Sequence, residues 1–264
     1  RSAILSKMLK LPAFVDFLKF RTSWASVGSA ISPNISSAWR YEYIPSTGTY
    51  HTVTYKFPDN FYPERTNSLE AGVTATLFKE ALSVKFTLYQ SNTKNQTFLR
   101  QITLGGAYNR EYIQAGNVRN RGLELTVGYN KKWTDSRWSV NMSYSMNHNR
   151  IVRLLDNPNE TLRQGGLNGC EVILTQGGTM GDLYTFTGFK RNQQGDIQVN
   201  ADGQVMQIEL PTPRLVGSVL PKAHLGLNNT FSWKGLEFRL LITARLGGVC
   251  VSQTQAFMDS YGVS

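Results

Sequence analysis

Alternation of apolar and polar side chains is the feature that most restricts the fold of this chain. From Leu82 to Tyr89 the sequence reads LSVKFTLY, so Leu82, Val84, Phe86 and Leu88 share one side of an extended strand. The same period of two recurs in six further segments: Leu18–Val27, Leu69–Leu77, Leu123–Tyr129, Trp138–Asn147, Ala223–Phe231 and Leu236–Leu246. We therefore predict an all-β fold whose strands each have one apolar face.

The polar faces of the predicted strands consist mainly of small uncharged residues. Between Trp138 and Asn147, the polar positions are occupied only by Ser and Asn. Charged residues make up 17% of the 264 residues, compared with about 25% in an average soluble domain. The water-facing side of a soluble β-sandwich commonly carries long charged side chains. Small polar groups instead favour a wall that surrounds a plug or a wet lumen.

The connections between the predicted strands alternate in length. Short turns follow Leu77, Tyr129 and Phe231, whereas the long connections are Gly28–Ser68, Gln90–Val118 and His148–Lys222. Aromatic residues that suit an interfacial girdle lie near the short turns: Tyr129, Trp133, Trp138, Phe231 and Trp233. Short turns at one end, long loops at the other and strands of roughly 10 residues predict a transmembrane antiparallel β-barrel.

Three blocks of sequence carry a resemblance to a known family. They are Pro63–Gly72 continued by Leu82–Gln96, then Ala115–Leu125 (AGNVRNRGLEL), then Val216–Gly248. In this order they resemble the carboxy-terminal barrel half of SusC/RagA-type TonB-dependent outer-membrane transporters. The resemblance implies a 22-stranded plugged barrel in the outer membrane of a Gram-negative bacterium. It further implies active import of a glycan or peptide oligomer, powered by TonB and assisted by a SusD-like surface lipoprotein.

The resemblance covers only part of such a transporter. We expect residues 1–264 to form a C-terminal segment of the barrel, and the plug domain and TonB box to lie outside this chain. The last residues, Tyr261–Ser264, resemble a loop rather than a terminal strand ending in an aromatic residue. Seven strands cannot close a barrel of this size, and open edges are not viable in lipid. We therefore expect contact with TonB to occur through the missing N-terminal part.

A cluster of aromatic residues marks the long connection Gly28–Ser68, which this topology places outside the cell. The candidates for ligand binding are Trp39, Tyr41, Tyr43, Tyr50, His51 and Tyr55. Such rings can stack on sugar rings or on peptide side chains, and binding residues are commonly found on loops. The alternative is that these rings only pack the loop.

A weak calcium candidate follows at Gln198–Glu209. Counting Gln198 as position one, the oxygen donors Asn200, Asp202 and Glu209 fall at positions three, five and twelve, with Gly203 at six. This is EF-hand spacing, although the first ligand is Gln and no helices flank it. The alternative is a polar turn at Asp202-Gly203 that leads into a strand at Val205–Glu209. We expect no other cofactor.

The formal net charge of +10 also requires an explanation. Basic residues predicted to face the lumen, namely Lys85, Arg239 and Arg245 together with Lys19, Arg21 and Lys222, outnumber the acidic Glu70, Glu124 and Glu237. They could contact an acidic plug or favour anionic cargo. Lys94, Arg100 and Arg110 are expected near the outer leaflet, beside lipopolysaccharide phosphates. Because the basic residues are dispersed, nucleic acid is not expected as a partner.

The remaining polar motifs do not indicate an enzyme. His51, His148 and His224 are far apart, and neither H-E-x-x-H nor G-x-S-x-G occurs. Cys170 and Cys250 are both expected on the extracellular side, as a disulfide or as two free thiols. Two alternatives to the importer remain. One is a soluble or cell-surface all-β carbohydrate-binding module, and the other is a passive porin without TonB dependence.

Overall fold

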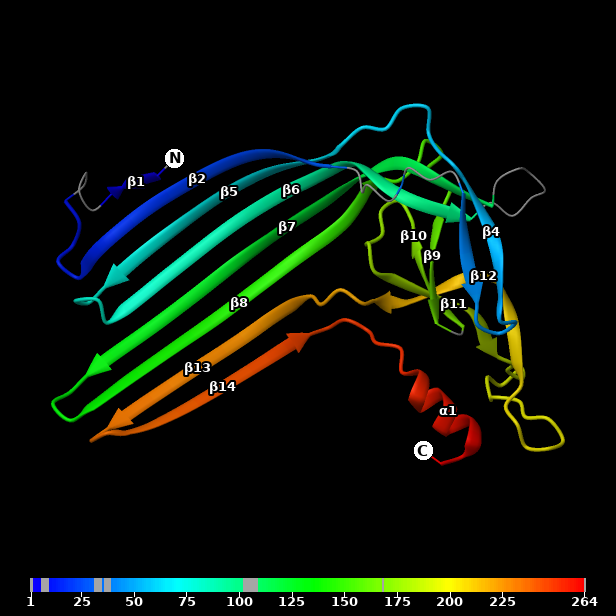
Figure 1. The fold of residues 1–264 in the computed structure, drawn as a ribbon. Helices are drawn as coiled ribbons and strands as arrows, with labels where there is room; N and C mark the ends of the chain where they lie inside the picture. Colours follow the sequence, from blue (N-terminus) through cyan, green and yellow to red (C-terminus); the bar gives the residue numbers. More distant parts are fainter. Residues whose placement is uncertain are drawn as a thin grey trace.

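A curved antiparallel wall dominates the structure (Figure 1). The structure is a computed structural model that describes residues 2–5, 10–30, 35, 39–101, 109–167 and 169–263. The wall contains, in spatial order, β1 (Ser2–Ile4), β2 (Val15–Ser29), β5 (Glu64–Leu77), β6 (Leu82–Gln101), β7 (Arg110–Lys132), β8 (Ser136–Arg153), β13 (Ala223–Trp233) and β14 (Leu236–Leu246). All seven segments predicted from the alternating pattern are strands of this wall, and the fold is a partial antiparallel barrel.

The register across the wall separates an apolar face from a polar face. Val73, Phe86, Leu125 and Tyr144 are direct neighbours on successive strands. One residue further along β6, Lys85 is flanked by Thr74 and Thr126, and Thr126 by Ser143. A shift of one residue changes the face, so the polar row lies on the opposite side of the wall from the apolar row. The wall thus has the apolar exterior and polar interior of a membrane barrel.

The aromatic residues near the short turns are neighbours in space. Trp138 on β8 pairs in register with Phe231 on β13, which pairs with Phe238 on β14. The Trp138 ring meets Tyr129 edge-on, with the ring centroids 5.6 Å apart, and its Nε1 donates to Asn229 Oδ1 at 2.6 Å. This arrangement agrees with the predicted interfacial girdle.

The long connections differ from the prediction because most of their residues form strands. β6, β7 and β8 contain 20, 23 and 18 residues, roughly twice the length needed to cross the bilayer. Gln90–Val118 is therefore largely an extension of β6 and β7. Gly28–Ser68 contains a hairpin of β3 (Trp39–Ile44) and β4 (Thr49–Lys56). The alternating pattern stops above the membrane because the extended strands no longer have one face in lipid.

The third long connection, His148–Lys222, contains a separate sheet. Its strands are β9 (Leu162–Leu167), β10 (Cys170–Leu174), β11 (Asp182–Phe189) and β12 (Gln207–Ser218), in the order β12-β11-β10-β9. A buried apolar cluster joins this sheet to the extended wall strands: Phe98, Val118, Ile151, Leu154, Leu162 and Leu174. The principal buried core therefore lies at the loop end of the wall.

Two local predictions need correction. Tyr261 is not in a loop but ends helix α1 (Gln253–Tyr261), which Gly262 caps in the left-handed conformation at φ 66°. The strand expected at Val205–Glu209 begins only at Gln207, since Val205 makes an isolated bridge with Val199. None of the described helices is long and apolar enough to cross a membrane.

Candidate functional site

The hairpin β3–β4 displays a row of exposed aromatic rings at the loop end of the wall. Tyr43 pairs with Tyr50, and Tyr41 and Trp39 follow at every second position of β3, so all four share one face. Their exposed fractions are 55% for Trp39, 65% for Tyr41, 54% for Tyr43 and 69% for Tyr50. Ring centroids are 5.5 Å apart for Trp39–Tyr41 and 5.2 Å for Tyr43–Tyr50. This surface, the aromatic row, offers stacking area to a ligand.

The other two aromatic candidates do not belong to this surface. Tyr55 is 3% exposed and stacks on Tyr112 with a centroid distance of 5.3 Å, while Tyr112 stacks on Phe57 at 5.5 Å. His51 is exposed, but it pairs with Glu42 on the opposite face of the hairpin. The alternative that the rings pack the loop thus describes Tyr55, whereas the aromatic row points to solvent.

An ion pair anchors the hairpin to β7. Arg110 donates from Nη1 and Nη2 to the two carboxylate oxygens of Glu42, at 2.6 and 2.8 Å. Burial alone would lower the pKa of Arg110, but the hydrogen bonds and charge of Glu42 outweigh it and raise that pKa above its usual range. β4 continues this attachment by pairing in parallel with β7 at Tyr55 and Lys56. The aromatic row is therefore presented on a hairpin fixed to the wall.

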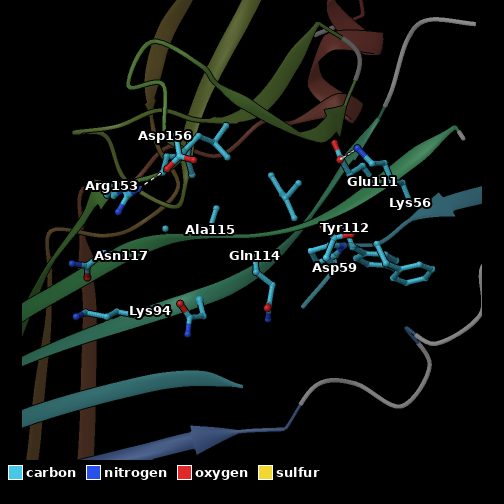
Figure 2. A pocket seen from close by; sticks show the side chains of 17 residues that line it. Lys56, Asp59, Lys94, Glu111, Tyr112, Gln114, Ala115, Asn117, Arg153 and Asp156 are labelled. Atoms are coloured by element: carbon cyan, nitrogen blue, oxygen red, sulfur yellow. Dashed lines mark hydrogen bonds and ion pairs between the residues drawn. The ribbon is translucent and has the colours of Figure 1, made fainter. Parts of the chain in front are cut away.

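Beside the hairpin lies a cavity of about 600 Å³ between β6, β7 and the segments that follow β4 and β8. Figure 2 shows Lys94 and Asn117 at one end of it, near the ion pair of Arg153 and Asp156. The other end is lined by Lys56, Asp59, Glu111 and Tyr112 (Figure 2). Charged and amide groups therefore face a volume large enough for a small ligand or for one or two units of an oligomer.

Two amide side chains define the middle of the cavity. Gln114 accepts from the backbone N of Tyr62 at 2.6 Å and donates to the Tyr62 carbonyl at 2.5 Å, which holds the segment after β4 against β7. Asn117 Oδ1 is buried and has no hydrogen-bond partner among the described residues. An unpaired buried acceptor costs about 1–3 kcal/mol, so a ligand donor or water at this point would be stabilising.

Glu111 connects three basic side chains at the far end of the cavity. It pairs with Lys56 at 3.0 Å and with Arg100, which also binds Glu160. Burial alone would raise the pKa of Glu111, but hydrogen bonds from Arg100 and Lys56 outweigh it and hold that pKa below its usual range. Glu111 is therefore a fixed anion within a basic surround.

These ion pairs correct the expected position of Arg100 and Arg110. Both were predicted beside the outer leaflet, yet their partners Glu111, Glu160 and Glu42 lie in the loop-end assembly. Arg110 is thirteen positions from Leu123, the last apolar outward residue of β7 toward the loops, or about 40 Å along the strand. The physical reason is the unexpected length of β6 and β7.

The basic residues predicted to face the lumen lie on the polar face, together with the Ser and Thr rows. Lys85 lies between Thr74 and Thr126, Arg239 pairs in register with Thr230, and Arg245 with His224. Arg239 binds Glu237, and Arg245 Nη2 donates to the Val219 carbonyl. Nearby on this face, Arg21 pairs with Glu70 at 3.2 Å and donates to Thr87 Oγ1 at 2.7 Å. Their influence on a plug or cargo stays a prediction.

The calcium candidate also stays a prediction, and the local geometry favours its alternative. Asn200 Oδ1 accepts from the backbone N of Asp202 at 3.0 Å and of Gln204 at 2.8 Å, which forms the expected polar turn. Glu209 lies in β12, in register with Thr187 on β11. Cys170 and Cys250 are two free thiols.

Sequence reasoning missed Glu42, Arg110, Gln114 and Asn117 as parts of one site. Asn117 and Gly116 were noted only within the block Ala115–Leu125. A signal was present in the density of polar residues at Arg110–Arg121, which have no apolar alternation although they lie between two strands. Their partners, however, come from β3 and from the segment after β4, and no local pattern identifies them.

The family can now be assigned, because a family model described as TonB dependent receptor-like, beta-barrel, matches residues 13–262. The chain belongs to the TonB-dependent receptor β-barrel family. Two curated relatives are TonB-dependent receptors P3 and P26 of Formosa agariphila. Receptor P3 is 23% identical over 74% of this chain and 22% of its own length. Receptor P26 is 24% identical over 66% of this chain and 19% of its own length. The chain thus spans about a fifth of these relatives.

Solved structures show the same fold. The RagAB peptide importer in the closed-closed state superimposes with a TM-score of 0.69 at 17% identity, over 94% of this chain and 28% of the other. A second structure of the RagAB peptide transporter gives 0.68 at 18% identity, over 92% of this chain and 28% of the other. The resemblance to SusC/RagA-type barrels is confirmed. This segment of a TonB-dependent barrel includes membrane wall and loop-end structure.

Proposed function

We propose that the protein containing this chain actively imports a peptide or glycan oligomer across the outer membrane of a Gram-negative bacterium. The proposal includes energy from TonB, reached through parts outside this chain, and a SusD-like lipoprotein at the cell surface. It is supported by family membership and by the fold shared with RagAB, which is described as a peptide importer. Family membership argues against a soluble carbohydrate-binding module.

The observation that carries the proposal is the aromatic row on an anchored hairpin beside a polar cavity. Flat rings at Trp39, Tyr41, Tyr43 and Tyr50 provide stacking area at low conformational cost, since each aromatic side chain has only two rotatable angles. The adjacent cavity adds hydrogen-bonding groups, among them the unpaired Asn117 Oδ1. Apolar stacking with polar anchoring suits a polymer built of repeated units, either sugars or amino-acid residues.

Uptake by cells that express the intact transporter tests the proposal. The probes are a fluorescently labelled protease digest of casein and a labelled partial hydrolysate of a polysaccharide. We expect uptake of one probe, loss of that uptake in a host without TonB, and at least about fivefold weaker binding after Trp39→Ala with Tyr41→Ala. Phe189→Ala, which removes an exposed ring from β11, is the matched control and should bind as the wild type does.

Each outcome separates the alternatives. TonB-independent uptake would support a passive porin and overturn active import. Unchanged affinity of the Trp39 and Tyr41 double variant would remove the aromatic row from the binding site while leaving the transport proposal to the uptake measurement.

A further inference from the structure

A cluster of basic residues faces outward directly above the lipid-facing apolar band. Leu88, Leu123 and Met146 form one outward row across β6, β7 and β8. Two residues further toward the loops on each strand, the same face carries Gln90, Arg121 and His148. The next outward row is Asn92, Arg119 and Arg150. We call Arg119, Arg121 and Arg150 the outer arginine cluster.

The opposite face of these strands confirms that the cluster points away from the lumen. Asn120, between Arg119 and Arg121, accepts hydrogen bonds from Nδ2 of Asn147 and of Asn149, each at 2.9 Å. Asn149 Oδ1 in turn accepts from the backbone N of Met180, in the segment that leads to β11. The inner face is therefore covered by the loop-end structure. Because side chains alternate along a strand, the arginines project to the outside.

Neutral amides orient two of the arginines. Arg119 Nε donates to Asn92 Oδ1 at 2.9 Å, and Arg121 Nε donates to Gln90 Oε1 at 2.6 Å. Both acceptors are side chains of the neighbouring strand β6. Each guanidinium therefore uses its Nε proton within the wall, while the terminal nitrogens can engage an external anion. A planar fork held in this way matches the geometry of a phosphate group.

The positive charge of the cluster is not balanced by the protein. None of the ion pairs found among the described residues includes Arg119, Arg121 or Arg150. Every Asp and Glu of the chain lies within the described residues. This contrasts with Arg100, Arg110 and Arg163, which all bind glutamates. Three uncompensated arginines on one face require an anion from outside the chain.

The height of the cluster identifies the source of that anion. One residue pair separates the last apolar row from the first basic row, or about 7 Å along the strand. Lipid headgroups begin at this level, directly above the hydrocarbon region. Trp24 on β2, 73% exposed and in register with Leu69, is a further outward aromatic near this boundary.

We propose that the outer arginine cluster binds the phosphate groups of an anionic glycolipid in the outer leaflet. Asn92 and Gln90 act as positioning residues that orient the guanidinium groups. Lys94 and Arg65, paired in register one row above, extend the basic surface toward the loops. The assignment rests on the proposed outer-membrane location, but it requires neither a particular cargo nor active transport.

The test uses the intact protein, purified in a neutral detergent and mixed with diphosphoryl lipid A, with its monophosphoryl form, or with inorganic phosphate. Native mass spectrometry measures the lipid bound. We expect the triple variant Arg119→Gln, Arg121→Gln, Arg150→Gln to bind diphosphoryl lipid A at least about tenfold more weakly than the wild type. The matched control Lys131→Gln, Lys132→Gln, Arg137→Gln removes three charges at the short-turn end and should retain wild-type affinity.

Single variants keep the test decisive if the triple variant does not fold. Arg121→Lys preserves the charge but loses the fork, so we expect an affinity between those of the wild type and Arg121→Gln. Weaker binding of monophosphoryl than of diphosphoryl lipid A supports phosphate recognition. Equal lipid A affinity for the wild type and both Arg121 variants would overturn the assignment. Inorganic phosphate that displaces lipid A at equimolar concentration would overturn the lipid as its ligand.

Lipid binding and import are measured separately, so their failures can be distinguished. Uptake of the peptide and polysaccharide probes should be unchanged in Arg121→Lys. Lipid A binding without TonB-dependent uptake would overturn the proposed function alone, and uptake with no loss of lipid affinity in the variants would overturn this inference alone.

Discussion

Glu42 and Arg110 form a two-point ion pair across 68 residues of sequence, with Nη–Oε distances of 2.6 and 2.8 Å. This contact joins the hairpin that carries the aromatic row to the loop end of β7. The side chains are 24% exposed for Arg110 and 35% for Glu42, so solvent weakens the pair only in part. The pair determines how firmly the aromatic row is held beside the cavity.

Arg110→Gln should therefore loosen the hairpin. Loss of a partly exposed ion pair costs about 1 kcal/mol, which corresponds to roughly fivefold faster amide exchange in β3 and β4. Hydrogen exchange with mass spectrometry on the intact protein measures this. Arg163→Gln, which breaks a similar fork with Glu171 in the second sheet, should leave exchange in the hairpin unchanged. Equal exchange in both variants would contradict the anchoring role of Arg110.

Acidification should loosen the start of β7, where Glu111 binds Lys56 and Arg100. Its pKa is lower in the folded protein than the ordinary carboxyl value. The stabilisation is therefore present at neutral pH and is lost as the pH falls through the folded pKa, below about 4.5. Protection factors corrected for intrinsic exchange should fall in this window near Glu111.

Glu111→Gln should remove that pH dependence and lower protection already at neutral pH. Glu209→Gln is the control, because this exposed carboxylate in β12 forms none of the ion pairs found among the described residues. If Glu111→Gln and the wild type share the same acid profile, the Glu111 network is not its cause.

Gly122→Ala should destabilise the wall. Tyr89 lies across Gly122 and donates to Asn147 Oδ1 at 3.3 Å, so an added Cβ would overlap the Tyr89 ring and the Met146 carbonyl. Overpacking of this kind costs about 1–3 kcal/mol. The unfolding temperature of the intact barrel in detergent should fall. Gly28→Ala, where the added Cβ would meet only the Glu64 carbonyl at 3.8 Å, should unfold as the wild type does.

Brominated lipids should quench Trp138 and not Trp39. Trp138 lies in the outward aromatic row near the short turns, whereas Trp39 lies on the hairpin at the loop end. Two versions of the reconstituted protein, each with one of these tryptophans and Phe at the others, permit the comparison. Stronger quenching of Trp39 than of Trp138 would place the membrane at the wrong end of the wall.

Much of the wall could be predicted because membrane strands leave a local signal. In Leu82–Leu88, every second side chain meets lipid, and this requirement acts on each residue separately. The strand extensions Gln90–Gln101 and Arg110–Leu123 left a weaker signal, since polar groups are tolerated on both of their faces above the bilayer. The expected loops were therefore strands, and Arg100 and Arg110 were placed too close to the membrane.

The candidate site was predictable only in part. Trp39, Tyr41, Tyr43 and Tyr50 were named from composition, and β-hairpin pairing brings them onto one exposed face. Tyr55 has the same chemistry, yet it is buried because β4 pairs with β7 at that residue. Composition cannot distinguish these cases, since burial depends on a parallel contact between strands that are distant in sequence.

The sequence by itself determined the seven wall strands, their faces and the aromatic girdle, because the two-residue period of an extended backbone converts the contrast between lipid and water into a local pattern. Only the tertiary structure decided that Arg110 binds Glu42, that Asn117 faces a cavity, and that Arg119, Arg121 and Arg150 form one outward cluster. Strand register and chain crossings bring these groups together, and neither is written in the alternation of any single strand.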